Sequence, residues 1–137
     1  MEGVPLTAAP LVVRPLLAFG RDEILAYVTI DTLKHSPEYA RNYVNRRVSK
    51  GIRLRGIYNN TPELQQYLAN NKGELRTSKV ISEKKFPIHN EINIYANKII
   101  INTYHPGPFG IMIESKEAAE TQRTIFELAW QGIPNTT

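Results

Sequence analysis

Short apolar runs alternate with helically spaced apolar residues in the first part of the chain. Residues 24–30 and 52–58 are rich in β-forming side chains, as in strands that are covered on both faces. Between these runs, Ser36-Pro37-Glu38 is typical of a helix start and Gly51 of a helix end. This order predicts two parallel strands joined by a helical crossover.

A second helix start and a change of rhythm follow. Thr61-Pro62-Glu63 predicts a helix over about 62–70. Beyond Gly73 the apolar pattern favours strands, then one last helix that Ser115 can cap. The predicted elements are strands at 75–81, 89–95, 98–104 and 109–114, with a turn at Ala96-Asn97, and a helix at 116–131.

These elements predict an α/β domain in the order β-α-β-α-β-β-β-β-α. Its sheet is mixed, with about six strands and helices on its faces. We expect residues 23–132 to form this domain, 1–22 to be a tail or the remnant of an upstream element, and 133–137 to be a tail. The site should lie outside the carboxyl ends of the parallel strands, near Asp31, Thr32, Asn59 and Asn60.

Composition narrows the classes of protein. The chain has 137 residues and no cysteine, which fits one core in a reducing compartment and excludes disulfides and thiolate metal sites. No apolar run is long enough to span a bilayer, and prolines interrupt the N-terminal apolar residues. We therefore expect a cytoplasmic protein without membrane contact. The net charge of +4 mildly favours anionic partners.

One predicted strand carries a row of polar side chains. Strand side chains alternate between faces, so His89, Glu91, Asn93, Tyr95 and Asn97 share one face. Carboxylate, amide and phenol groups suit the hydroxyls of a sugar or another polar small molecule. The row could instead be the solvated face of a hairpin or a contact between two copies. For His89 alone, a structural hydrogen bond is an equal alternative.

The same strand resembles the motif strand of phospholipase-D-like domains, which carry His-x-Lys-x4-Asp. His89 matches the motif histidine, but Glu91 stands in place of the lysine and Ala96 in place of the aspartate. A carboxylate opposes the developing negative charge of phosphoryl transfer. The resemblance therefore implies a phospholipase-D-like fold without catalytic residues, and it leaves a residual phosphodiesterase or nuclease using His89 as an alternative.

The degenerate motif also resembles the effector domain of TrmB-type, sugar-responsive transcription regulators. The segments that carry this likeness are 46–55, 91–98, 113–116 and 119–130, and it extends over residues 23–131. It implies a catalytically inactive sensor domain that binds a sugar or phosphorylated metabolite through His89, Glu91, Asn93, Tyr95 and Asn59, without a cofactor. Such regulators begin with a winged helix, for which residues 1–22 are too short. We therefore expect DNA contact only through a separate or missing domain.

Two further expectations concern partners. Phospholipase-D-like sites combine two facing motif halves, so the resemblance implies that a chain with one half forms a homodimer. A dimerisation module is a further alternative. The basic residues between Arg41 and Arg55 could bind nucleic acid or phosphate, with Arg53 and Arg55 as anion-binding candidates, or form a solvated helix face. The histidines lack metal-ligand spacing, so no metal site is expected.

Overall fold

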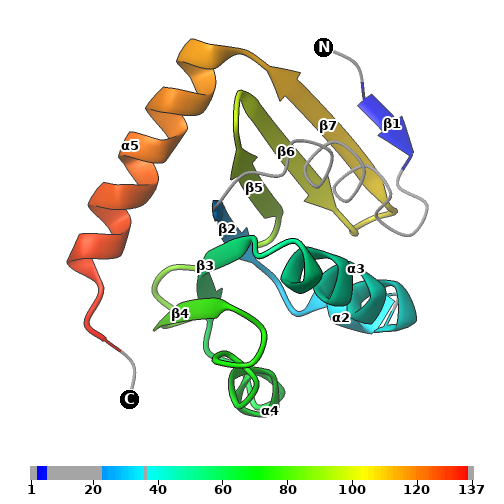
Figure 1. The fold of residues 1–137 in the computed structure, drawn as a ribbon, viewed down its shortest axis with the longest axis vertical. Helices are drawn as coiled ribbons and strands as arrows, with labels where there is room; N and C mark the ends of the chain where they lie inside the picture. The colour runs from blue at the N-terminus through cyan, green and yellow to red at the C-terminus, as the bar shows by residue number, and fades with distance from the viewer. Residues whose placement is uncertain (1–2, 6–22, 36, 136–137) are drawn as a thin grey trace.

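The computed structural model describes residues 3–5, 23–35 and 37–135. Its centre is one mixed sheet in the strand order β1-β7-β6-β5-β2-β3-β4. The strands are β1 (Gly3–Pro5), β2 (Glu23–Val28), β3 (Arg53–Asn59), β4 (Arg76–Ile81), β5 (Glu91–Tyr95), β6 (Lys98–Thr103) and β7 (Phe109–Glu114). The helices are α2 (Asp31–His35), α3 (Pro37–Ser49), α4 (Leu64–Leu68) and α5 (Lys116–Gly132). Figure 1 shows α5 on one side of the sheet and α2, α3 and α4 on the other.

The predicted fold class is confirmed: a mixed sheet carries helices on both faces. β2, β3 and β4 lie parallel, while β5, β6 and β7 form an antiparallel meander that joins them through the pair β2–β5. The predicted helix end at Gly51 and the predicted helix cap at Ser115 are also confirmed. Gly51 ends α3 with a φ of +69°, and the Ser115 hydroxyl caps α5 by accepting the Ala118 amide at 3.1 Å. The predicted cap at Ser36 lies outside the described residues.

The sequence analysis did not predict two short elements, strand β1 and helix α2. Residues 3–5, expected within a tail, form strand β1 and pair antiparallel with the edge of β7. Three residues ending in a proline carry no strand pattern of their own, so this strand depends on the neighbouring edge. Helix α2 begins three residues after the end of β2 and has only five residues. A single helical turn has no amphipathic period to detect.

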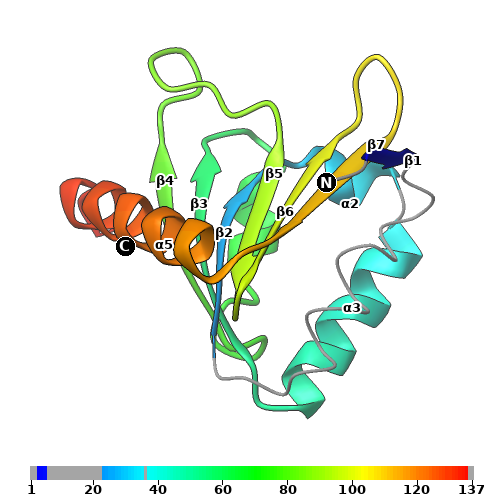
Figure 2. The same cartoon turned by 90° about the horizontal axis from the view of Figure 1, so that it is seen from above.

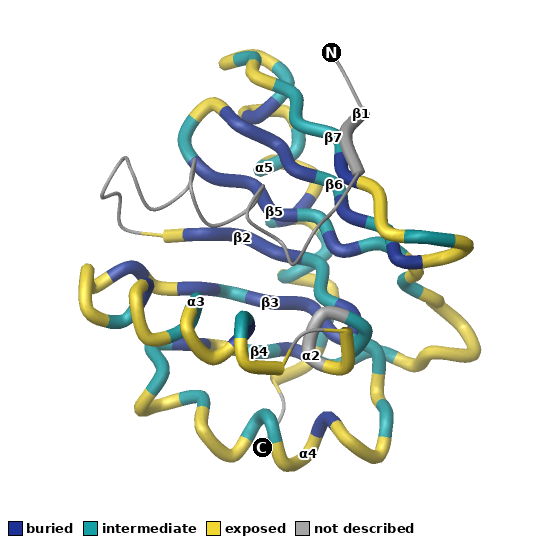
Figure 3. Tube along the Cα trace, turned by 90° about the vertical axis from the view of Figure 1, so that its right-hand side faces the viewer, coloured by how far each residue is buried: buried dark blue, intermediate teal, exposed yellow. Residues whose placement is uncertain are grey.

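The sheet separates two apolar cores. On the α5 side, Leu25, Ile57 and Ile94 pack against Ala119 and Phe126 of the helix. On the α3 side, the buried side chains pack against α3. They are Ile24, Ala26, Ile52, Leu54, Tyr95 and Ile100. The central strands β2, β3, β5 and β6 are accordingly the most buried part of the trace (Figure 3). Burial on both faces explains their continuous apolar runs.

The topology gathers several loops at one edge of the sheet. The carboxyl ends of the parallel strands β2, β3 and β4 lie at this edge. Because β5 runs antiparallel to β2, its beginning lies there too, and so does the end of β6. Figure 2 shows the loops after β4 and β6 rising from this edge, beside α2. We call it the carboxyl edge and the opposite one the amino edge.

Candidate ligand-binding site

A cavity of about 280 Å³ opens at the carboxyl edge. Its walls come from the ends of β2 and β3, the start of α2, helix α4, and the loops after β4 and β6. The lining residues are Val28, Thr29, Ile30, Asp31, Tyr58, Asn59, Thr61, Leu64, Tyr67, Glu83, Pro87, Ile88, His89 and His105. This is the place at which ligands bind in open α/β sheets, outside the carboxyl ends of parallel strands.

Asn59, the last residue of β3, fixes the loop that closes one wall. Its Nδ2 donates to the carbonyl oxygen of Phe86 at 2.8 Å, and its Oδ1 accepts from the Ile88 amide at 2.6 Å. These two bonds hold the segment before β5 against the end of β3. They bring His89 to the rim of the cavity, where its side chain is exposed.

Two threonine hydroxyls in the cavity wall are buried without a hydrogen-bond partner. Thr29 follows β2, and Thr61 comes two residues after β3. Neither Oγ1 forms a hydrogen bond of good geometry with a described residue, although the Thr61 side chain lies close enough to Glu63 to help lower the pKa of that carboxyl group. An unsatisfied buried hydroxyl costs roughly 1–3 kcal/mol of stability. A polar partner in the cavity would offset this cost at both threonines.

Aromatic rings form the floor of the cavity. The Tyr58 ring folds back over Gly56, where an added Cβ would lie 2.5 Å from Cε1. It then packs on Tyr67, with ring centroids 5.6 Å apart. Burial raises the pKa of Tyr58 well above its ordinary value, and nearby Tyr67 raises it further. Both phenols thus remain neutral and present an apolar face with polar tips.

The charged groups at the cavity are acids and imidazoles. Asp31 and Glu83 line it together with His89 and His105, and the His105 Nε2 lies 3.6 Å from Asp31 Oδ1. No lysine or arginine lines the cavity within the part of the chain that the structure describes. Carboxylate oxygens and imidazole nitrogens suit a neutral, hydroxyl-rich molecule better than a phosphate.

The polar row on β5 is divided by the structure. His89 lines the cavity. Glu91, Asn93 and Tyr95 are instead buried on the face of the sheet that α3 covers. There Asn93 Nδ2 donates to Glu91 Oε2 at 3.2 Å, and Tyr95 packs in the core. Ala96, which stands at the position of the motif aspartate, occupies the hairpin turn at the amino edge with a φ of +53°.

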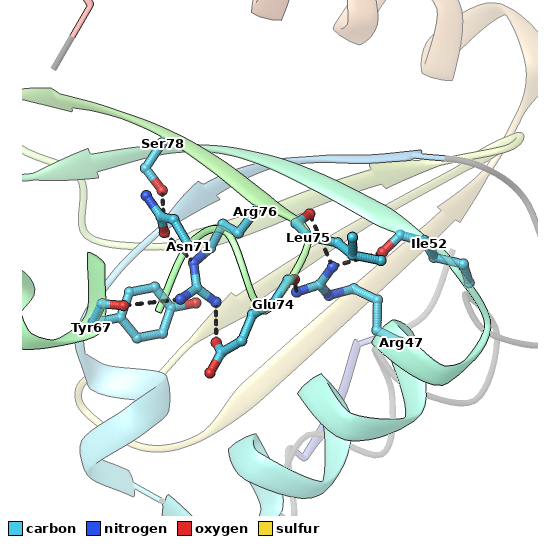
Figure 4. Close-up of polar contacts among 8 residues, drawn as sticks. All are labelled: Arg47, Ile52, Tyr67, Asn71, Glu74, Leu75, Arg76 and Ser78. Carbon is cyan, nitrogen blue, oxygen red and sulfur yellow. Dashed lines mark hydrogen bonds and ion pairs between the residues drawn. The ribbon is translucent and has the colours of Figure 1, made fainter. Parts of the chain in front are cut away.

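Within the basic run between Arg41 and Arg55, Arg47 has a structural role, whereas the side chains of Arg41, Arg46, Lys50 and Arg53 are exposed. Arg47 is fully buried and donates to the carbonyl oxygens of Ile52 at 2.7 Å, Glu74 at 2.6 Å and Leu75 at 3.4 Å. Burial lowers the pKa of its guanidinium. Figure 4 shows this residue tying the end of α3 to the loop before β4.

Arg76 completes the same network from β4. It donates to Asn71 Oδ1 at 2.8 Å, to Glu74 Oε1 at 2.7 Å and to the Tyr67 carbonyl oxygen at 3.0 Å. Its guanidinium carbon lies 3.7 Å from the centroid of the Tyr67 ring. The network therefore holds Tyr67, one of the residues that line the cavity, in place (Figure 4).

The two anion-binding candidates differ. Arg55 bonds to both Glu127 oxygens, at 2.9 and 2.6 Å, and to both Glu23 oxygens, at 3.1 and 3.2 Å. The bonds to Glu127 are the first reason that its pKa is raised. Arg53 is exposed and makes no ion pair within the described ranges. Arg53 is therefore the residue of this pair that is free to meet an anion.

Sequence reasoning missed several cavity residues. Thr61 looked only like a helix start, and His105 only like part of a turn. Thr29 lay inside a predicted strand, with nothing to mark its hydroxyl as unpaired. Position at a strand end is a usable signal, since it correctly brought Asp31 and Asn59 to the cavity. The side chain of Thr32 lies outside what the structure describes.

The fold is similar to that of a known DNA-binding protein. A solved structure of TrmBL2, described as an archaeal chromatin protein with a novel mode of DNA binding, aligns over 98% of this chain with a TM-score of 0.65 and 12% identity. The chain spans 54% of the length of that protein. No protein-family model and no curated protein sequence matches the chain. At this identity, the likeness establishes a shared fold.

No helix in the described part of the chain is long and apolar enough to cross a bilayer. Nor do its histidine, aspartate and glutamate side chains gather in a group of three or more suited to a metal ion.

Proposed function

We propose that this chain is a ligand-sensing regulatory domain of a transcription regulator, and that it binds a small, neutral, hydroxyl-rich molecule such as a sugar at the carboxyl edge. The observation that carries the proposal is the pair of buried, unpartnered hydroxyls of Thr29 and Thr61 in one cavity wall. A sugar hydroxyl can both donate and accept, so it would satisfy each of them.

The size and lining of the cavity support a compact ligand. Its volume of about 280 Å³ lies at the lower limit of ligand pockets, which span roughly 300–1,000 Å³. The apolar face of a sugar ring would lie against the tyrosine floor, with Asp31, Glu83 and the two histidines at its edges. His89 acts here as a binding residue on the rim. Glu91, Asn93 and Tyr95 support the strand that carries it.

The regulatory role is proposed from the fold. TrmBL2, which shares it, is described as a chromatin protein that binds DNA. In our proposal the DNA contact belongs to a separate domain, and this domain reports the ligand. A catalytic role is disfavoured because the motif lysine is replaced by a buried glutamate, Glu91, and a carboxylate opposes phosphoryl transfer.

A thermal-shift panel tests the proposal directly. Monosaccharides, disaccharides and polyols are screened against the full chain, and a specific binder stabilises it by mass action. We expect at least one monosaccharide to raise Tm in a saturable way. We further expect Thr61→Val to abolish that shift, while Thr121→Val, at an exposed position on α5, retains it. A panel without any saturable shift, or an equal response of both variants, would reject the site.

A further inference from the structure

A second cleft lies at the amino edge of the sheet, on the opposite side from the sugar cavity. It has a volume of about 390 Å³ and lies between the start of β3 and the loop that precedes β4. We propose that it binds a small oxyanion, namely a phosphate or diphosphate group, held between Arg53 and Lys72.

Arg53 and Lys72 are the free cations of this cleft. Both side chains are exposed, and neither forms an ion pair or a side-chain hydrogen bond with another described residue. Arg53 offers a planar fork that can bind two phosphate oxygens, and Lys72 offers a point charge. The exposed Thr77, also in the lining, adds a hydroxyl donor.

The acid in the cleft is already neutralised. Glu23, which pairs with Arg53 in the backbone register, directs both carboxylate oxygens to Arg55. The other cation in the lining, Arg76, is held by Glu74. Four cations line the cleft, and the carboxylates that pair with them are three, namely Glu23, Glu74 and Glu127. The uncompensated charge is positive, and the two cations without partners are Arg53 and Lys72.

The cationic lining of this cleft differs from that of the cavity at the carboxyl edge, and the difference supports an anionic ligand here. That cavity carries no lysine or arginine among its described lining residues, whereas this cleft carries four. Two other exposed cations of the basic run, Arg46 on α3 and Lys50 after its end, do not line the cleft. Substitution of either residue by Gln removes one positive charge from the same end of the domain without changing the cleft, so these variants are matched controls.

Calorimetric titration of the full chain with inorganic pyrophosphate at fixed ionic strength tests the proposal. We expect saturable binding that Arg53→Gln and Lys72→Gln each weaken roughly tenfold, the loss of one charge-assisted contact. Arg46→Gln and Lys50→Gln should weaken it less than about twofold, a screened long-range effect. Thr61→Val should leave it unchanged, which separates this cleft from the proposed sugar site.

Two results would overturn the cleft as an oxyanion site. One is the absence of saturable pyrophosphate binding to the wild-type chain. The other is an equal loss for all four charge variants, because a dispersed basic surface gives that pattern. A parallel titration with a short DNA duplex distinguishes the source of the phosphate. DNA binding that the four variants weaken alike, without pyrophosphate binding, would assign the cations to a nucleic-acid backbone and contradict the proposal.

Discussion

The two edges of the sheet treat buried polar groups in opposite ways. At the amino edge, Arg47 and Arg76 are buried with three hydrogen bonds each to described partners, although the Nε of Arg47 has none. At the carboxyl edge, the hydroxyls of Thr29 and Thr61 are buried with none. Satisfied groups of this kind hold a fold together, and unsatisfied ones lower its stability. The amino edge therefore contains a buried network that holds the fold together, and the carboxyl edge contains the unsatisfied hydroxyls on which the proposed ligand site rests.

Removal of Arg47 tests the structural edge and should have the largest effect. Arg47→Met retains much of the buried volume but leaves the carbonyl oxygens of Ile52 and Glu74 without their donor. We expect a loss of about 3 kcal/mol or more in the free energy of unfolding, measured by urea denaturation. Arg46→Met, at the exposed neighbouring position, should stay within about 0.5 kcal/mol. Similar values for the two variants would show that the network contributes little.

Gly56 connects the fold to the cavity floor. In Gly56→Ala the new methyl group would meet the Tyr58 ring at 2.5 Å, so the ring must leave its place against Tyr67. We expect a loss of about 1–3 kcal/mol together with weaker ligand binding. Gly73→Ala is the control, because nothing lies within 4 Å of its added Cβ. An unchanged Tm for Gly56→Ala would mean that the Tyr58 ring is not held in this position.

Thr29→Val sharpens the comparison from the other edge. The substitution keeps the shape of the side chain and removes a buried hydroxyl without a described partner. We expect the variant to be more stable than the wild type by about 1 kcal/mol, measured in urea, while it binds the sugar less well. Stability and binding thus move in opposite directions. A destabilised variant would show that the hydroxyl is already satisfied.

The smallest expected effect on stability concerns the ion pair between Arg55 of β3 and Glu127 of α5. The hydrogen bond from Arg55 is the main cause that lowers the pKa of Glu127 below its ordinary value of 4.5. A carboxylate with a lowered pKa in the folded state stabilises the fold above pH 4.5, and this contribution is lost as the pH falls through the lowered value. Glu127→Gln should therefore flatten the acid limb of the Tm-against-pH curve. An unaltered acid limb would contradict this assignment.

The sequence predicted the helices and strands better than it predicted the environment of individual side chains. Strand and helix periods, Gly51 and Ser115 predicted most of the sheet and the ends of two helices, because these signals are local. Alternation along β5 correctly placed Glu91, Asn93 and Tyr95 on one face, but it could not tell a buried face from a cavity wall. That distinction depends on α3 and α4, which pack from elsewhere in the chain.

Charge runs were equally ambiguous in the sequence. Arg47 and Arg53 belong to the same basic run, yet one is wholly buried and the other exposed. The partners of Arg47 lie partly in the loop before β4, and those of Arg55 lie partly on α5. No local pattern reveals which cation has such a distant partner. Two of the candidate site residues, His89 and Asn59, line the cavity, and a role for them in binding stays a prediction.

Backbone amide chemical shifts, followed by NMR during a monosaccharide titration, test the central claim most directly. The carboxyl-edge cavity as a sugar site predicts saturable shifts at Thr29, Thr61 and His89, with the amides of Arg53 and Lys72 unmoved. Shifts that stay at baseline for every sugar tried, or that gather at the amino edge, would contradict it.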